Sequence, residues 1–395
     1  MGSEPGVGWN ISKELAKHHE IWVLTRSDNR PMIEAELEKN PIAGFNFIYC
    51  DLPGVSWWKK GLQGVHLHYY LWQISAYFNA RRLHYQVGLD IVHHVTYVRY
   101  SSPSFLAFLP IPFVWGPVGG GEVAPKAFWE DFSFRGKFYE ILRKLAHQLG
   151  EFDPFTRLTA QRSFVVRATT EDTAKRLCSI GATNVQIISE SGLSQHEIAC
   201  LLECAPSNTT PVRFISMARL LHWKGLHLSL QAFSQADLPE NTEYWILGEG
   251  PERERLQVLA EKLGITDRLK FWGRLPRNET LEKLRQSHVL VHPSLHDSGG
   301  WVCLEAMAAG RPVICLDLGG PAIQVTEKTG FKVSAQEPKQ AIAGIAEAMA
   351  LLAHDSALRV QMGQEGQHHV KESYSWEAKA ILLSQVYQEC VSGKA

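Results

Sequence analysis

The sequence predicts an α/β protein built from two domains, each with a largely parallel sheet. Its 395 residues exceed a typical single domain, and a hydrophobic content of 45% can fill two cores. Short apolar runs alternate with amphipathic segments along most of the chain, which is the pattern of strands joined by crossover helices. A polar, proline-containing stretch between Ser191 and Pro211 marks the boundary. We therefore expect one domain over residues 1–195, a second over 210–372, and a last helix over 373–395.

The first domain is expected to begin with a glycine-containing loop, a helix and a strand. Gly6 and Gly8 lie in the expected loop, and residues 21–24 form a short apolar strand. The apolar positions that recur on one helical face are Val7, Ile11 and Leu15.

Two further segments of the first domain carry candidate site residues. An apolar strand ends at His93 and His94, and since neighbouring strand residues point to opposite faces, only one of them is expected to face a substrate. Downstream, Gly119 and Gly120 belong to a run of three glycines. Such a run either lets the backbone approach a substrate closely or makes a tight turn without a ligand.

In the second domain, candidate ligand residues follow the carboxyl ends of the expected strands. Arg219 and Lys224 flank the loop after the apolar run 213–217. Two cations at such a position suit a diphosphate leaving group, whose negative charge grows as its bond to a sugar breaks. The alternative is a pair of solvated surface charges. The glycines that end the next two strands are Gly248, Gly250 and Gly273. Open α/β sheets bind their ligands at this edge.

The most informative segment runs from Asp297 to Glu305. The glycine-rich turn opens a helix from Trp301 to Ala309, so that unpaired backbone N–H groups would face a phosphate. Carboxylates on either side of the turn can hold hydroxyl groups of a sugar and a ribose. The alternative is an ordinary strand–turn–helix with a solvated Asp and Glu. The residues of the turn are Ser298, Gly299 and Gly300.

Residues 212–331 resemble the donor-binding domain of retaining glycosyltransferases of family 4. The shared elements are an Arg-x4-Lys pair, a Gly-x-Gly strand end, an aromatic-Gly strand and an acidic-x7-Glu element, in the family's order. The resemblance implies the GT-B fold, in which two Rossmann-like domains face each other across a cleft and the last helix crosses back to the first domain. The family's sheet also has a strand ahead of the first glycine loop, where this sequence has only Met1 before Gly2. We therefore expect the first strand to be missing.

The resemblance also implies roles for individual residues. Arg219 and Lys224 would bind the nucleotide diphosphate, Glu305 the ribose, and Asp297 the transferred sugar. Asp297 is one methylene shorter than the family's Glu, which leaves the sugar open. His94, or His93 as second choice, would lie near that sugar. The backbone groups expected to contact the base are those of Gly273, Arg274 and Leu275, and the amides expected to meet the phosphates are those of Gly300, Trp301 and Val302.

We therefore expect a retaining hexosyltransferase that moves a sugar from a nucleotide diphosphate sugar to a hydroxyl of a glycan, a lipid-linked acceptor or a small molecule. No Asp-x-Asp metal motif stands in the right place and two cations can replace a metal, so neither a metal nor a cofactor is expected. Two alternatives stay open. One is a sugar-nucleotide epimerase with the GT-B fold, and the other is a non-catalytic or truncated nucleotide-sugar-binding protein.

Composition and charge exclude several classes of protein. A net charge of −1 argues against general affinity for nucleic acid. With no apolar run of transmembrane length, no signal peptide and seven scattered cysteines, a cytoplasmic protein is expected. The segments 52–88 and 124–162, rich in aromatic and basic residues, either pack their aromatics inside or rest on the inner face of a membrane as a peripheral contact. The oligomeric state stays open.

Overall fold

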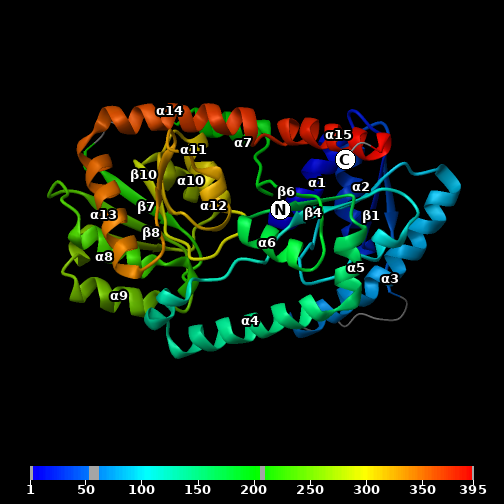
Figure 1. Cartoon of the computed structure of the whole chain (residues 1–395). Helices are drawn as coiled ribbons and strands as arrows, with labels where there is room; N and C mark the ends of the chain where they lie inside the picture. Colours follow the sequence, from blue (N-terminus) through cyan, green and yellow to red (C-terminus); the bar gives the residue numbers. More distant parts are fainter. Residues whose placement is uncertain (1–2, 53–61, 205–209, 394–395) are drawn as a thin grey trace. The chain divides into compact units, whose positions relative to one another are not determined.

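The computed structural model describes residues 3–52, 62–204 and 210–393. The chain divides into two compact units (Figure 1). The first comprises Met1–Gly121, Leu145–Ile188 and Trp376–Ala395, and the second comprises Glu122–Lys144 and Ser189–Ser375. These units differ from the expected division at 195 and 210, because residues 122–144 group with the second unit although they lie far from it in sequence.

The second unit is built on one six-stranded parallel sheet in the order β12-β11-β10-β7-β8-β9. Read from β9, this is the doubly wound order of a Rossmann fold, and the chain reverses direction across the sheet between β7 and β10. The strands are β7 Arg213–Met217, β8 Glu243–Leu247, β9 Leu269–Gly273, β10 Val289–His292, β11 Val313–Leu316 and β12 Gly330–Val333.

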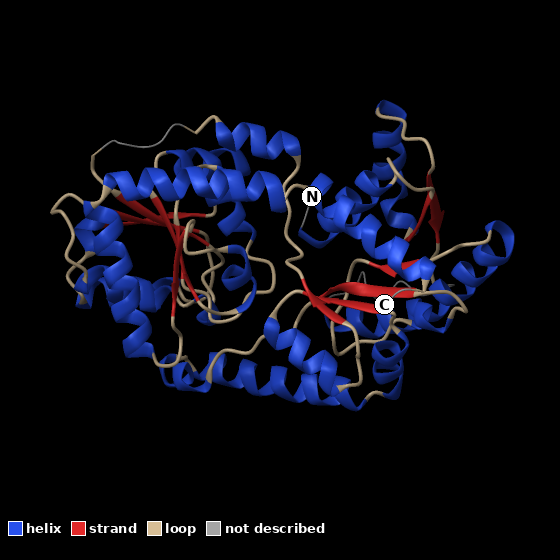
Figure 2. Ribbon diagram, turned by 45° about the horizontal axis from the view of Figure 1, so that its top comes forward, coloured by secondary structure: helices blue, strands red, loops and turns tan. Residues whose placement is uncertain are grey.

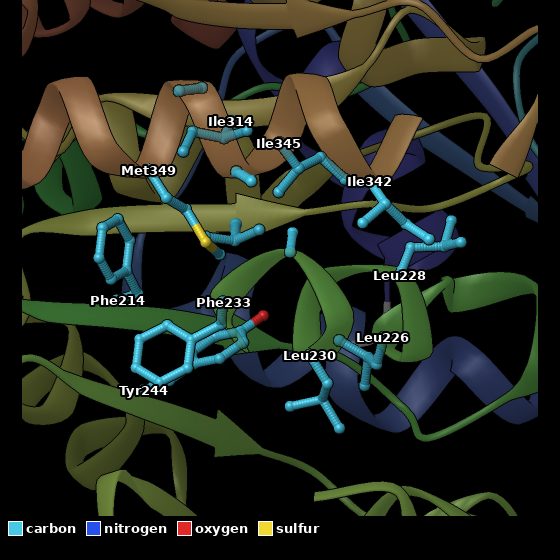
Figure 3. Packing of buried hydrophobic residues seen from close by; sticks show 14 of the residues in the cluster. Phe214, Leu226, Leu228, Leu230, Phe233, Tyr244, Ile314, Ile342, Ile345 and Met349 are labelled. Carbon is cyan, nitrogen blue, oxygen red and sulfur yellow. The ribbon is translucent and has the colours of Figure 1, made fainter. Parts of the chain in front are cut away.

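Helices cover this sheet, and alternation along the strands sends neighbouring residues into two hydrophobic clusters. Phe214 and Ile215, consecutive in β7, belong to different clusters. Figure 3 shows the first cluster, where Phe214 and Tyr244 lie near Ile345 and Met349 of α13. The helices are α7 Gln195–Leu202, α8 Leu226–Gln235, α9 Arg253–Lys262, α10 Arg277–Arg285, α11 Trp301–Ala308, α12 Gly319–Gln324, α13 Pro338–His354 and α14 Ser356–Ser373.

The first unit has two parallel sheets, β1-β2 and β3-β4-β5-β6 (strands red in Figure 2). Within the described residues no backbone pairing joins β1 or β2 to β3, so strands expected in one sheet form two. The strands are β1 Ile21–Thr25, β2 Phe45–Tyr49, β3 Val92–His94, β4 Phe113–Val118, β5 Val165–Ala168 and β6 Val185–Ile187. The helices are α1 Ser3–Leu15, α2 Arg30–Lys39, α3 Leu62–Val87, α5 Pro154–Arg162, α6 Glu171–Ser179 and α15 Trp376–Ser392.

The helix α4, Phe134–Phe152, begins in the second unit and ends in the first. No single helix in the described ranges is long and apolar enough to span a membrane, although α13 and α14, bent by 104° at their junction, together pass that test by length and composition.

The expected loop position of Gly6 and Gly8 was wrong, because both lie within α1. Val7, Ile11 and Leu15 form its buried face, as the sequence pattern predicted. A Cβ atom on Gly8 would stand 2.7 Å from the Thr96 side chain, so a glycine at this position lets α1 pack closely on the segment after β3.

Two features favour glycine at position 225, just before α8: its left-handed backbone conformation and its close approach to another loop. The effects of the two can be separated experimentally. Its φ is +65°, and a Cβ atom there would lie 2.0 Å from the carbonyl oxygen of Pro293, in the loop after β10. Gly264 has nearly the same φ, +66°, but a Cβ atom there would meet no atom within 4 Å.

Gly264→Ala should therefore cost only the left-handed backbone strain, roughly 1 kcal/mol of unfolding free energy. Gly225→Ala should cost at least about twice as much, because the two loops must also move apart. Urea unfolding of both variants measures the difference, and equal losses would contradict the close approach of these loops.

Candidate functional site

The loops after β7 and β10 meet at the switch point of the second unit's sheet. Because β7 and β10 are paired neighbours and the chain leaves them in opposite directions, a crevice is expected outside their carboxyl ends. The two loops are bonded to each other: the carbonyl of Trp223 accepts hydrogen bonds from the Leu295 N–H at 2.8 Å and from the Ser294 hydroxyl at 3.4 Å.

An ion pair joins these loops. Lys224 contacts Oδ2 of Asp297, and His292 Nε2 lies 3.1 Å from the same oxygen. Burial alone would raise the pKa of Asp297, but the charge of Lys224 and the hydrogen bond from His292 hold that pKa well below its usual range. Burial lowers the pKa of His292. Neutral His292 therefore donates its Nε2–H to a carboxylate that stays ionised.

Arg219 stands at the same edge with its side chain exposed. In the part of the chain that the structure describes, its guanidinium has no hydrogen bond and no ion pair. Asp297 neutralises the charge of Lys224, whereas no described residue neutralises Arg219. Arg219 therefore leaves positive charge available for an anionic ligand.

The glycine turn before α11 is held in place by hydrogen bonds to residues of other segments. Gly300, with a φ of +61°, is the N-cap of α11, and the carbonyl of Gly299 accepts hydrogen bonds from Gln324 and Ser191. The indole Nε1–H of Trp301 donates to the Gly192 carbonyl at 3.0 Å, and the Ser298 hydroxyl donates to Glu190 at 3.3 Å. These contacts fix the turn, so that the first amides of α11, which have no acceptor within the helix, keep one direction.

Glu305, in α11, is buried and accepts a hydrogen bond from Nη1 of Arg277 at 2.6 Å. Burial raises the pKa of Glu305, and the half-exposed Arg277 offsets only part of that rise. We did not identify Arg277 from the sequence. The signal was available, because Arg277 opens α10 four residues after Gly273 and therefore lies at the same sheet edge.

The other expected donor-binding residues lie at the ends of β8 and β9. The Gly248 N–H donates to the Gly273 carbonyl at 2.7 Å, and the Leu220 N–H donates to the Glu249 carbonyl at 2.8 Å, which ties this turn to the loop after β7. Gly250 accepts from the N–H of Arg253 at 3.2 Å. Arg274 is exposed and Leu275 is half-buried.

The two candidate histidines belong to the first unit and differ in their partners. His94 Nε2 lies 2.6 Å from the hydroxyl of Tyr69, and its buried Nδ1 has no hydrogen-bond partner among the described residues. His93 contacts the Gly116 carbonyl at 2.6 Å and the Tyr387 hydroxyl at 2.5 Å. Burial lowers the pKa of His94 to about 4 and that of His93 to about 3, so both are neutral near pH 7.

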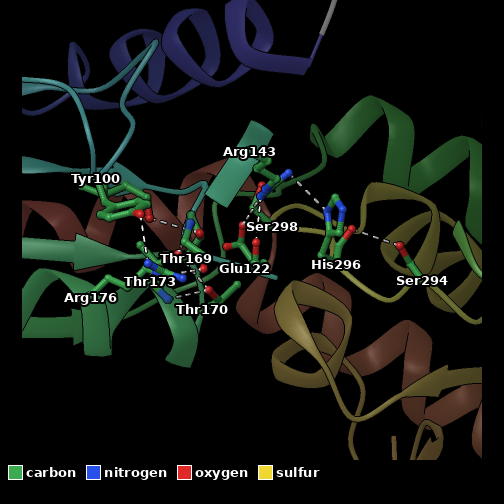
Figure 4. A network of polar contacts seen from close by, with 12 residues as sticks. Tyr100, Glu122, Arg143, Thr169, Thr170, Thr173, Arg176, Ser294, His296 and Ser298 are labelled. Atoms are coloured by element: carbon green, nitrogen blue, oxygen red, sulfur yellow. Dashed lines mark hydrogen bonds and ion pairs between the residues drawn. The ribbon is translucent and has the colours of Figure 1, made fainter. Parts of the chain in front are cut away.

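The glycine run after β4 also lies in the first unit. Gly119 forms an isolated parallel bridge with Arg99, and Gly120 follows it with a positive φ. The next amide, that of Gly121, donates to the Thr173 hydroxyl at 3.1 Å. Arg176 of α6 donates to the Gly121 carbonyl at 2.9 Å and to the Tyr100 hydroxyl at 3.2 Å (Figure 4).

Comparison with known proteins identifies the family of the second unit. Residues 204–369 match the family described as glycosyl transferases group 1. This part of the chain is therefore similar to group 1 glycosyl transferases. The group 1 match covers the loops after β7 and β10, the glycine turn, Glu305 and Arg277.

Two curated group 1 relatives illustrate the similarity in sequence. D-inositol 3-phosphate glycosyltransferase of Corynebacterium glutamicum (strain R) is 31% identical over 197 residues, which are 48% of this chain and 46% of that protein. The lipopolysaccharide core biosynthesis glycosyltransferase LpsD of Rhizobium meliloti (strain 1021) is 31% identical over 165 residues, 42% of this chain and 46% of that protein. The chain thus spans about half the length of these relatives.

Solved structures extend the similarity in fold to the whole chain. Sucrose-phosphate synthase of Thermosynechococcus elongatus aligns with a TM-score of 0.65 and 17% identity over 99% of this chain and 94% of that one. HepE of Anabaena in complex with UDP and glucose aligns with a TM-score of 0.59 and 16% identity over 98% of each. The predicted α/β class with two Rossmann-like domains of GT-B type is confirmed.

Glu305→Gln should separate ligand binding from stability. Since burial makes the pKa of Glu305 higher in the folded than in the unfolded chain, ionisation of this carboxyl lowers stability as the pH rises above its ordinary range. At pH 7 the variant should therefore unfold at a temperature equal to or above that of the parent protein. Its affinity for a nucleoside diphosphate should fall at least about tenfold, through loss of a charged hydrogen-bond acceptor for the ribose.

Calorimetric titration and thermal unfolding measure the two effects, with Glu347→Gln on the exposed side of α13 as the matched control. Unchanged nucleotide affinity in Glu305→Gln would remove Glu305 from the ligand site.

Proposed function

We propose that the protein is a retaining hexosyltransferase that moves a sugar from a nucleotide diphosphate sugar to an acceptor hydroxyl. The observation that carries this proposal is the ionised Asp297, bonded to Lys224 and His292, at the switch point beside the unpaired Arg219. Carboxylate, cations and helix amides stand together where a Rossmann-like sheet binds nucleotides.

The donor would lie across this edge of the sheet. Glu305 would hold the ribose, and the backbone of residues 273–275 would contact the base. Lys224 and Arg219, with the amides at the start of α11, would hold the diphosphate. Asp297 would then accept a hydrogen bond from a hydroxyl of the transferred sugar. Lys224 contacts Asp297, so a bound phosphate oxygen would share this lysine with the carboxylate.

Transfer would proceed on one face of the sugar. The acceptor oxygen forms a bond to the anomeric carbon while the bond from that carbon to the diphosphate oxygen breaks. The acceptor proton passes to the leaving phosphate, and the products are the glycoside with retained configuration and the nucleoside diphosphate. Lys224 and Arg219 stabilise the charge that develops on the diphosphate, which is the part of the reaction where electrostatic stabilisation contributes most. In this proposal they take the place of a metal ion.

A thermal-shift panel of UDP, GDP and ADP, each with its common sugars, tests donor binding. One nucleotide should raise the melting temperature, since a ligand at a hundred times its Kd stabilises the folded state by about 2.7 kcal/mol. UDP is the first choice because HepE, which shares the fold, binds UDP and glucose. EDTA should leave the shift unchanged. Loss of the shift in EDTA would make the proposed metal independence wrong, and no shift with any nucleotide would contradict the donor site.

We also propose a cytoplasmic location with peripheral contact to the inner membrane face, through α4. The amphipathicity of this helix is reversed, because its buried face is polar and its exposed face is apolar. Phe134 and Phe152, at its two ends, are 85% and 76% exposed. The exposed apolar residues at helical spacing are Phe134, Phe138, Ile141, Leu145, Leu149 and Phe152, and the cations beside them are Arg135, Lys137 and Lys144. An apolar stripe with basic flanks fits an anionic lipid surface.

Among the aromatics of residues 124–162, Phe128 and Phe132 are buried, whereas Phe134, Phe138 and Phe152 are exposed, and only the exposed ones support the proposed membrane contact. In the other segment rich in aromatic and basic residues, 52–88, Trp57 and Trp58 lie outside the described residues.

Flotation with vesicles tests the membrane contact. The protein should bind vesicles that contain phosphatidylglycerol more tightly than vesicles of phosphatidylcholine alone. The double variant Phe134→Ser with Leu149→Ser should lose at least about tenfold in binding, because two large apolar side chains no longer enter the interface. Val258→Ser, which removes an exposed apolar residue on α9, is the control and should bind normally. Equal binding by the double variant and the parent would contradict this contact.

A further inference from the structure

The buried face of α4 carries a carboxylate that the proposed reaction does not use. Glu140 is 1% exposed, and its Oε1 accepts hydrogen bonds from Nε2 of His222 at 3.1 Å and Nε2 of His296 at 3.2 Å. Its Oε2 is buried and has no hydrogen-bond partner among the described residues. The polar residues that share this face are Glu140, the partly buried Arg143 and His147. A buried carboxylate is costly, so its position calls for a specific reason.

The two histidines belong to the two loops that carry the candidate reactive residues. His222 precedes Lys224 by two positions in the loop after β7, and His296 directly precedes Asp297 in the loop after β10. One carboxylate oxygen on α4 thus bonds both loops at once. All these residues lie within the second unit.

Aromatic stacking reinforces this connection. Trp223, between His222 and Lys224, stacks with His296 at 5.1 Å and 17° and with Tyr139 of α4 at 5.0 Å and 15°. His222 packs edge-on against Trp223 at 4.7 Å. Tyr139 and Glu140 are consecutive, so one turn of α4 contacts both loops through a ring and a carboxylate.

The charges around Glu140 fix its protonation and the direction of its hydrogen bonds. Arg143 lies 3.5 Å from Nδ1 of His296 (Figure 4) and can only donate. The hydrogen of this ring is therefore on Nε2, which lies 3.2 Å from Oε1 of Glu140. Burial would raise the pKa of Glu140, but the hydrogen bonds from His222 and His296 lower it to about 2. Burial lowers the pKa of His296. Arg143 itself donates to the Glu122 carbonyl at 2.8 Å and lies 4.0 Å from the Glu122 carboxylate.

We infer that Glu140 is a positioning residue for the donor site: by bonding His222 and His296 it sets the separation of Lys224 from Asp297 that the diphosphate and the sugar require. This inference rests on the proposed function. Glu140 would not touch the donor and would act only through the two loops. If Glu140 only filled space, an apolar side chain of the same volume would serve as well. Proteins with such a side chain are often as stable as, or more stable than, those with a buried ionic group.

Two substitutions separate these roles. Glu140→Gln keeps an oxygen that can accept both histidine hydrogen bonds, and its amide nitrogen takes the place of the oxygen that has no partner. Glu140→Leu keeps much of the volume and removes the acceptor. Glu130→Leu is the matched control, because Glu130 is an exposed glutamate in residues 122–144, the segment that also carries Glu140.

The measurement is calorimetric affinity for whichever of UDP, GDP or ADP binds the parent protein, and for its monophosphate. Glu140→Leu should weaken diphosphate binding at least tenfold and leave monophosphate binding within about threefold, because the hydrogen bonds of Glu140 go to the loops that carry Lys224 and Asp297. Glu140→Gln should stay within about threefold for both ligands, and Glu130→Leu should match the parent. A general loss of folding would weaken both ligands together, and thermal unfolding verifies that each variant is folded at the titration temperature.

His296→Phe keeps a ring beside Trp223 but cannot donate to Glu140, and it should show the same selective loss. It decides the question if Glu140→Leu does not fold. If the parent protein binds no nucleotide, the proposed function fails. If the parent binds but Glu140→Leu and His296→Phe keep its ratio of diphosphate to monophosphate affinity, the positioning role is overturned while the proposed function stands.

Discussion

The half-buried carboxylate of Asp297, in the loop after β10, is the constraint on which the rest of the site depends. An ionised group in this position needs a cation and a hydrogen-bond donor. The loop after β7 supplies Lys224, and the end of β10 itself supplies His292. This requirement brings the loops after β7 and β10 together, with Gly225 close to Pro293 and Trp223 bonded to residues 294 and 295. A diphosphate that enters here would meet a lysine already held in place.

The carboxylates of Asp297, Glu305 and Glu140 all lie in poorly solvated positions of the second unit, and each has a different partner. Asp297 has a lysine, Glu305 has a half-exposed arginine, and Glu140 has two histidines. The different partners have different consequences, since the pKa of Glu305 is raised whereas those of Asp297 and Glu140 are lowered. Of these three carboxyl groups, Glu305, which is proposed to contact the ribose, is the one whose pKa is raised. The folded protein therefore stabilises the ionised form of Glu305 least. If Glu305 binds the ribose as proposed, stability is given up there for ligand binding.

The sequence predicted those parts of the site that depend on local pattern. Lys224 and Asp297 each follow an apolar strand, and the carboxyl ends of parallel strands share one edge, so their approach could be expected. Arg277 was missed although its position four residues after Gly273 marks it, whereas Glu140 was missed because its histidine partners lie 82 and 156 residues away and no local pattern marks it. Gly6 and Gly8 were placed in a loop because glycines usually interrupt helices, whereas packing on Thr96 favours a glycine inside α1. No periodicity could assign residues 122–144 to the second unit, since that grouping depends on tertiary contacts.

The most direct test of the central claim is a calorimetric titration of the bound nucleoside diphosphate into Lys224→Ala, Asp297→Asn and the parent protein. Lys328→Ala serves as control, because this exposed lysine precedes β12 and so lies at the opposite edge of the sheet. If Lys224 binds the diphosphate, Lys224→Ala should lose at least about tenfold in affinity, whereas Asp297→Asn, which removes the competing carboxylate charge, should bind at least as tightly as the parent. Unchanged affinity in Lys224→Ala would contradict the claim that this ion pair marks the diphosphate site.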